Sequence, residues 1–243
     1  MSTEHPKRNL IGVGEDQLLW RVYSVQWLLE LLATKKNVLV SPSKWEDPFE
    51  NILARCTGKL HGQFISLGSL TTGVFGQCWT DQSVEADATW QNYAPGAERG
   101  IRVRVKAGEL LDTIYRKDEA TSAVSCFLGK VGYWAEPAIC NWLNNLSVSG
   151  HLLVSDPRPI IETLLLKRQE FEHESEVRLL YMDPTNSMRS QQVLPVNCVP
   201  SELIQEMLLD PRSTISEATT VRRRIQCLGY RKKVTQSKLY QTP

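Results

Sequence analysis

One ten-residue stretch near the front of the chain, 41–50, is dense in groups that could do chemistry. It holds three carboxylates, a lysine, two serines and two aromatic rings around two prolines. It directly follows Val38–Val40, an apolar run typical of a buried strand. Folds often place sites where a chain leaves a buried strand and becomes rich in such groups. The candidates from this stretch are Ser41, Ser43, Trp45, Asp47, Phe49 and Glu50.

A second acidic stretch lies far downstream, at 171–178. Alternate residues of a strand share one face, so we expect Glu174, Glu176 and Arg178 to project together if this stretch is extended. Lys167 lies a few positions upstream and could reach the same place. The two stretches together predict a site that combines carboxylates with cations.

Periodicity of apolar residues predicts the elements that must position these groups. Their order is mixed and shows no regular alternation, which indicates an α+β fold with largely antiparallel strands. We expect one domain over 1–243, with a flexible N-terminus over 1–14 and a flexible loop over 58–76, which is rich in glycine, serine and threonine. Predicted strands are 18–23, 38–40, 76–80, 100–105, 130–134, the stretch carrying Glu174 to Arg178, and one near Val234; predicted helices are 25–35, 83–93, 137–146, 159–168, 201–209 and 221–228.

Composition indicates a globular chain and argues against a polyanion-binding protein of high net charge, a metal site of cysteines or histidines, and a membrane protein. The chain has 243 residues, 42% hydrophobic and 23% charged, which is ordinary globular material. Its net charge of +1 gives no general attraction to nucleic acid or to an anionic membrane, so any polyanion must be met by a local patch. The six cysteines show no zinc-ligand spacing, and no histidine has a second one at ligand spacing, so we expect no metal site built on them. The polar start and the absence of a long apolar run predict a cytoplasmic protein with no membrane partner.

Nearly the whole chain resembles the bacterial family called domain of unknown function twenty-nine seventy-one. The resemblance is carried by 19–23, by Asp47-Pro48-Phe49-Glu50, by 78–80, by 90–93, by Lys167 ahead of Glu174, Glu176 and Arg178, and by the tail 234–240. Glu46 stands where the family usually has asparagine. The family name implies no activity.

A second resemblance, to the ADP-ribosyltransferase fold, implies one. Enzymes of that fold have an arginine or histidine on the first strand, a serine on the second, and a late Glu-x-Glu strand; Arg21, Ser41 or Ser43, and Glu174 with Glu176 occur in that order. The resemblance implies that NAD is a substrate, that Arg21 holds its phosphates or ribose, and that Glu176 is catalytic while Glu174 orients the acceptor. It also implies an ADP-ribosylating transferase of the toxin or defence type, whose acceptor is a protein, a nucleic acid or water, with an antitoxin or immunity protein as a candidate partner.

The chemistry of that reaction fits these residue types. Loss of nicotinamide leaves an oxocarbenium-like ribose, which a carboxylate stabilises. Arginine pairs two phosphate oxygens at once. Trp45, Phe49 and Tyr93 could stack on the nicotinamide or the adenine.

Other interpretations of the same residues stay open. Asp47 and Glu50 could cap a helix beginning at Pro48, and Glu174 to Arg178 could form a solvated ion pair. The same acids with Lys167 could instead hold Mg²⁺ in a nuclease. A third alternative is a binding module without enzymatic activity, in which Arg222–Arg224 and Arg231–Lys233 contact nucleic acid or a protein.

Overall fold

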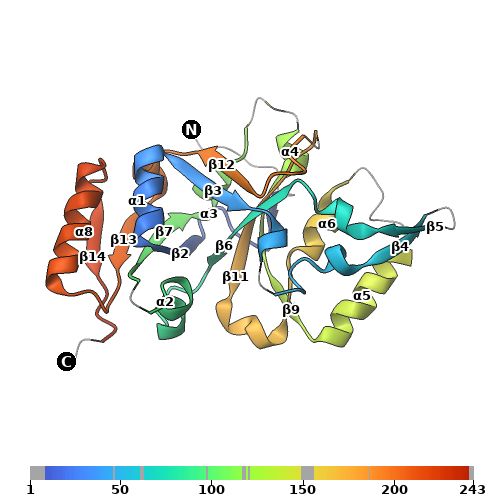
Figure 1. Cartoon of the computed structure of the whole chain (residues 1–243), viewed down its shortest axis with the longest axis horizontal. Helices are drawn as coiled ribbons and strands as arrows, with labels where there is room; N and C mark the ends of the chain where they lie inside the picture. Colours follow the sequence, from blue (N-terminus) through green and yellow to red (C-terminus); the bar gives the residue numbers. More distant parts are fainter. Residues whose placement is uncertain are drawn as a thin grey trace. The chain divides into compact units, whose positions relative to one another are not determined.

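The computed structural model describes residues 9–45, 47–60, 63–96, 98–116, 119, 121–148, 156–185 and 187–240 (Figure 1). Its contacts group the chain into two compact units. Unit 1 comprises 1–14, 38–78 and 114–194, and unit 2 comprises 15–37, 79–113 and 195–243. Strands β3 (Lys36–Val40), β6 (Val74–Thr80) and β12 (Val193–Asn197) contribute residues to both.

The strands of unit 1 bring the second acidic stretch into the middle of a sheet. Strand β11 (Glu176–Met182) pairs antiparallel with β8 (Cys126–Lys130), which pairs in parallel with β1 (Leu10–Ile11). Strand β6 lies beside β11 on the other side. Two small sheets complete the unit: parallel β9 (Gly132–Trp134) with β10 (Leu166–Arg168), and antiparallel β4 (Thr57–Leu60) with β5 (Gln63–Ser66).

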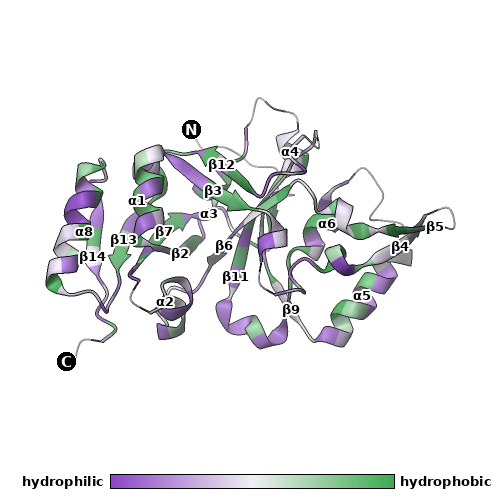
Figure 2. Ribbon diagram, in the orientation of Figure 1, coloured by the Kyte–Doolittle hydropathy of each residue, from purple (hydrophilic) through white to green (hydrophobic). Residues whose placement is uncertain are grey.

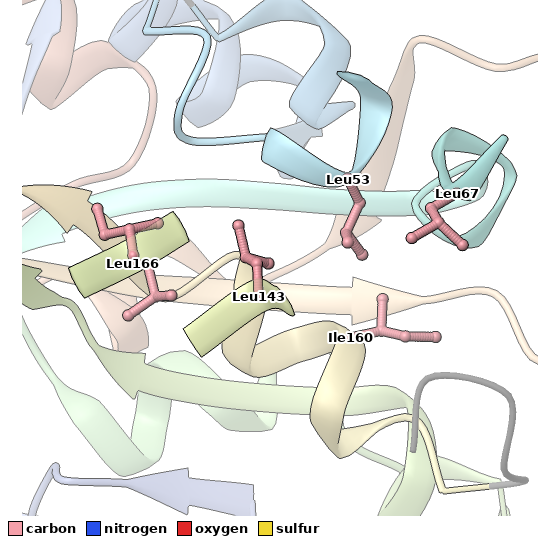
Figure 3. Packing of buried hydrophobic residues seen from close by; sticks show 6 residues of the cluster. Leu53, Leu67, Leu143, Ile160 and Leu166 are labelled. Carbon is pink, nitrogen blue, oxygen red and sulfur yellow. The ribbon is translucent and has the colours of Figure 1, made fainter. Parts of the chain in front are cut away.

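Short helices connect these strands and build the core of unit 1. They are η2 (Pro42–Lys44), η3 (Ile52–Arg55), η4 (Leu67–Leu70), α4 (Ser122–Ser125), α5 (Glu136–Val148), α6 (Arg158–Thr163) and η6 (Gln169–Glu174). One buried cluster joins Leu53, Leu67, Leu143 and Ile160, from four of these helices, with Leu166 of strand β10, as Figure 3 shows. Burying such side chains stabilises the fold by roughly 1.5–3 kcal/mol each. The cluster therefore fixes β10, which carries Lys167.

Unit 2 is built on a long antiparallel pair. Strand β2 (Leu18–Ser24) pairs with β7 (Gly100–Lys106) over seven residues, and β7 pairs with β13 (Glu206–Leu209), which runs parallel to β14 (Lys233–Gln236). The helices are α1 (Val25–Thr34), α2 (Asp87–Tyr93), α3 (Ala107–Asp112), α7 (Pro200–Leu203) and α8 (Ile215–Cys227). Ser24 caps α1 by accepting from the Trp27 amide, and Thr214 with Glu217 forms a capping box on α8.

Several sequence-based predictions are confirmed. The α+β class with mixed, mostly antiparallel strands is observed. The predicted elements at 18–23, 25–35, 100–105 and 137–146 correspond to β2, α1, β7 and α5. The single-domain organisation stays a prediction.

Two predicted helices are partly wrong. The helix expected over 159–168 ends at Thr163, and 166–168 is strand β10. Leu164, Leu165 and Leu166 are all buried, so this run has no polar face from which a helical period could be distinguished. The helix expected over 201–209 ends at Leu203, because Met207 and Leu209 alternate inward as strand β13.

The stretch 58–76 is not a plain loop. Its described residues form most of the β4–β5 hairpin, η4 and the start of β6, and Leu67, Val74 and Phe75 are buried. At the N-terminus, residues 1–8 lie outside the described residues, whereas Asn9 is buried and Leu10–Ile11 form β1. Glu46 also lies outside the described residues.

Candidate functional site

Three consecutive elements of unit 1 position the second acidic stretch. Strand β10 carries Lys167, helix η6 ends at Glu174, and β11 begins at Glu176. Ser175 lies between them in the left-handed region, with φ 45° and ψ 56°. Glu174 is therefore not on the strand, which corrects the expected alternation, while Glu176 and Arg178 do share one face of β11. The turn at Ser175 lets both carboxylates reach the same lysine.

Arg178 is the centre of a buried ion-pair network. Its Nε donates to Glu176 Oε1 at 3.0 Å and its Nη2 to Glu176 Oε2 at 2.9 Å. Nη2 also donates to Glu50 Oε1 at 2.7 Å, and Nη1 donates to the Leu164 carbonyl at 2.7 Å. The side chain of Arg178 is fully buried. Such a guanidinium is tolerated only because every edge of it meets an acceptor.

Lys167, on strand β10 of the small β9–β10 sheet, completes the network. Its Nζ lies 2.6 Å from Glu174 Oε2, 2.9 Å from Glu50 Oε1 and 3.4 Å from Glu176 Oε2. We call Glu50, Lys167, Glu174, Glu176 and Arg178 the charged cluster. Three carboxylates against two cations leave one negative charge. Glu174 is the member in contact with solvent, with 27% of its side chain exposed against 10% or less for the other four.

The cluster holds Glu176 and Lys167 in their charged forms. Burial alone would raise the pKa of Glu176, but Arg178 and Lys167 outweigh burial and hold it at about 2. Burial opposes the charged form of Lys167, yet Glu176, Glu174 and Glu50 raise its pKa above the ordinary value. Glu176 is therefore an ionised carboxylate at physiological pH. It can act through its charge and its hydrogen bonds but not as a general acid.

Three residues that the sequence interpretation missed surround Glu176 and Arg178. The Tyr133 hydroxyl accepts from the Glu176 amide at 2.7 Å, and the Cys78 thiol hydrogen-bonds the Glu176 carboxylate. Leu164 supplies its carbonyl to Arg178. No spacing or charge pattern marks these positions. Trp45, which was predicted, lies with its ring 4.5 Å from the Arg178 guanidinium carbon.

Asp47 belongs to a second ion pair in the same unit. Its Oδ1 accepts from the Phe49 amide at 3.0 Å, and Arg168 donates to both its oxygens at 3.3 and 3.4 Å. No helix begins at Pro48, so Asp47 caps only a turn, and Glu50 turns to the charged cluster instead of closing a capping box. The Arg168 guanidinium carbon lies 4.9 Å from the Phe49 ring and 5.3 Å from the Phe171 ring. Arg168 is a contact residue that the sequence analysis did not select, although it selected the neighbouring Lys167.

The remaining candidates are Ser41, Ser43, Arg21 and Tyr93. The Ser41 and Ser43 hydroxyls are 2.9 Å apart, and Ser43 donates to Gln192. Arg21 and Tyr93 belong to unit 2, where Arg21 lies over the Tyr23 ring at 5.1 Å and Tyr93 ends α2. Their roles stay predictions.

The described residues also bear on the expectations about a metal site and a membrane span. No group of three or more histidine, cysteine, aspartate or glutamate side chains there is arranged to hold a metal ion. Among the helices of the described chain, none is both long enough and apolar enough to cross a membrane.

The fold and the site define an α+β chain with a buried carboxylate–cation cluster, and comparisons add distant structural likenesses. Comparison with protein-family models finds no match, so membership of the family twenty-nine seventy-one is not confirmed. No curated protein matches either. The chain is similar to Thermus sp. 2.9 DarT in complex with ADP-ribosylated ssDNA, at a TM-score of 0.39 and 11% identity over 98% of both chains. It is also similar to the same protein with NAD+, at a TM-score of 0.37 and 10% identity over 93% of this chain and 98% of that one. Similarity at this level assigns no activity to the chain.

Proposed function

We propose that the chain is an NAD-dependent ADP-ribosyltransferase whose reacting centre lies at the charged cluster. The observation that supports this most is the pairing of a fixed, ionised Glu176 with the partly exposed Glu174 on a shared lysine. A site of this kind offers negative charge that needs no rearrangement when positive charge develops on a sugar.

The reaction requires such a site. The bond between ribose C1′ and the nicotinamide nitrogen breaks, nicotinamide leaves with the electron pair, and an acceptor oxygen or nitrogen bonds to C1′ and loses its proton. Glu176 contributes its charge and Glu174, the member open to solvent, contacts the ribose or the acceptor. Arg178, Lys167 and Glu50 hold both carboxylates in place.

The aromatic rings and guanidinium groups that NAD would require are also available. Phe49 and Phe171 are half-buried beside Arg168, whose side chain is 31% exposed. Arg168 is thus a second candidate, beside Arg21, for contact with the NAD phosphates.

The metal-dependent nuclease alternative fits this geometry less well. Lys167 Nζ lies among the oxygens of Glu50, Glu174 and Glu176, in the place that a divalent ion would need. Because the ammonium group already satisfies these carboxylates, a metal ion would have to displace it.

Nicotinamide release from NAD by purified protein, followed by chromatography, tests the proposal. We expect Glu174→Gln and Glu176→Gln each to lower the rate by on the order of 100-fold. NAD should also raise the melting temperature of the wild-type protein.

Glu172→Gln is the matched control, since Glu172 is an exposed carboxylate on the same helix η6. It should keep the wild-type rate. Circular dichroism checks that each variant folds. A wild-type protein that neither binds nor cleaves NAD, or Glu174 and Glu176 variants that keep full activity, would contradict the proposal; loss of activity on addition of EDTA would favour the nuclease.

A further inference from the structure

The last part of the chain has a one-sided charge composition. Downstream of Glu217 there is no acidic residue and there are seven basic ones. They occur on helix α8, in the turn after it, on strand β14 and just beyond. We call them the basic surface: Arg222, Arg223, Arg224, Arg231, Lys232, Lys233 and Lys238.

Helix α8 and strand β14 lie side by side within unit 2 (Figure 1), so these residues share one region. The buried face of α8 is formed by Ala218 and Ile225. Arg222 Nε donates to the Val234 carbonyl of β14 at 3.4 Å. Arg223 and Arg224 are exposed on the helix. Figure 2 shows that hydrophilic residues make up most of the visible part of α8.

Most of this positive charge is not neutralised. Among the described residues, one ion pair joins the basic surface to a carboxylate, between Lys233 and Glu206 at 3.7 Å. Arg222 donates to the Val234 carbonyl and Lys232 to the carbonyls of Glu202 and Ile204, and these bonds leave the charge in place. Arg224 borders a groove between α1 and α8 that also contains Glu30, with which it makes no ion pair.

We propose that the basic surface binds the phosphate backbone of nucleic acid without reading the bases. Four of its seven members are arginines, whose planar fork pairs two phosphate oxygens. A group of cations that mostly make no ion pair with a carboxylate binds a polyanion through counterion release, which makes binding strong at low salt and weak at high salt. Such binding does not require ADP-ribosyl transfer and is measured without NAD.

An anionic membrane is the less suitable polyanion for this surface. A helix that lies on a membrane presents a large apolar stripe to the lipid beside its basic residues. The apolar stripe of α8 is short: Ala218 and Ile225 are buried against the protein, and Ile215, in the first turn, is the large apolar residue that α8 exposes. The exposed helix residues three or four positions from Arg223 are Thr219, Thr220, Gln226 and Cys227, none of which is a large apolar residue.

Fluorescence anisotropy with labelled single-stranded DNA, duplex DNA and RNA of mixed sequence tests the proposal over a series of salt concentrations. We expect binding that does not depend on sequence and that weakens steeply with salt. Reversing three charges in R223E/R224E/R231E should abolish binding or reduce the slope of log K against log salt by about two to three.

The control K35E/K36E/R55E makes the same change in net charge at exposed positions outside the basic surface and should keep wild-type binding. Circular dichroism confirms that both variants fold. The proposal is overturned if wild-type protein binds none of the nucleic acids, if the two triple variants bind alike, or if the protein binds vesicles of phosphatidylserine and phosphatidylcholine but not nucleic acid.

Discussion

Glu50 and Arg178 are 128 positions apart in the chain and meet in a buried ion pair of 2.7 Å. The pair joins the first acidic stretch to the second. Glu50 Oε1 accepts from Arg178 and from Lys167 at once, so one oxygen ties the residues after β3 to both β10 and β11. Removing any member leaves a buried charge without its partner.

Arg178→Ala should therefore destabilise the protein strongly. Glu176 and Glu50 would stay buried without the guanidinium, and we expect the free energy of unfolding to fall by roughly 3–5 kcal/mol in urea denaturation. Arg158→Ala, which breaks an exposed pair with Glu162, is the control and should cost about 0.5 kcal/mol or less. An equal loss in the free energy of unfolding for the two substitutions would mean that the buried network stabilises the fold no more than an exposed ion pair does.

The stability of the protein should depend on pH through Glu176. The folded pKa of about 2 lies below the ordinary 4.5, so the unfolded chain takes up the proton first as the pH falls. The stabilisation from this ionised group is complete above about pH 4.5 and is lost as the pH falls to about 2. Glu176→Gln should accordingly be less stable than wild type near neutral pH, and the difference should shrink over that window in thermal melts. A difference that stays constant down to pH 2 would show that the charge of Glu176 is not stabilised in the fold.

Gly76→Ala should disturb the cluster through Trp45. A Cβ at position 76 would lie 2.7 Å from Trp45 Cζ2 and 2.9 Å from Leu180 Cδ2, so the ring over Arg178 must move. We expect a loss of roughly 1–3 kcal/mol in stability and a change in tryptophan fluorescence. Gly132→Ala, whose added methyl group would lie 3.4 Å from Trp134 Nε1 and make only ordinary contacts, should keep the stability of wild type and is the control for that measurement.

The local pattern of apolar residues was sufficient to predict several of the main strands and helices of the fold. The alternation of Ile101, Val103 and Val105 with charged residues predicts β7. The spacing of Leu28, Leu31 and Leu32 predicts α1, because that helix has one buried and one exposed face. At 164–166 every residue is buried, and the helical period gave the wrong element there.

The types of residues in the candidate site could be predicted, but their pairing could not. Carboxylates and cations in both acidic stretches indicated a shared site, and Glu50, Lys167, Glu174, Glu176 and Arg178 do meet. The bond from the Glu176 amide to Tyr133 and the pair between Asp47 and Arg168 depend on contacts over 43 and 121 positions, for which a single sequence carries no signal.

Ser175 offers a test of how the two carboxylates are aligned. Its left-handed backbone, with φ 45°, is unfavourable for most side chains and most of all for β-branched ones. Ser175→Val should lower the free energy of unfolding by roughly 1–2 kcal/mol and shift Glu174 away from Lys167. Ser175→Gly can adopt the same turn without strain, so it should be more stable than the valine variant and release nicotinamide faster. Urea denaturation and the nicotinamide assay on both variants separate these effects, since a valine variant as stable and active as the glycine variant would mean that the turn does not align Glu174 with Glu176.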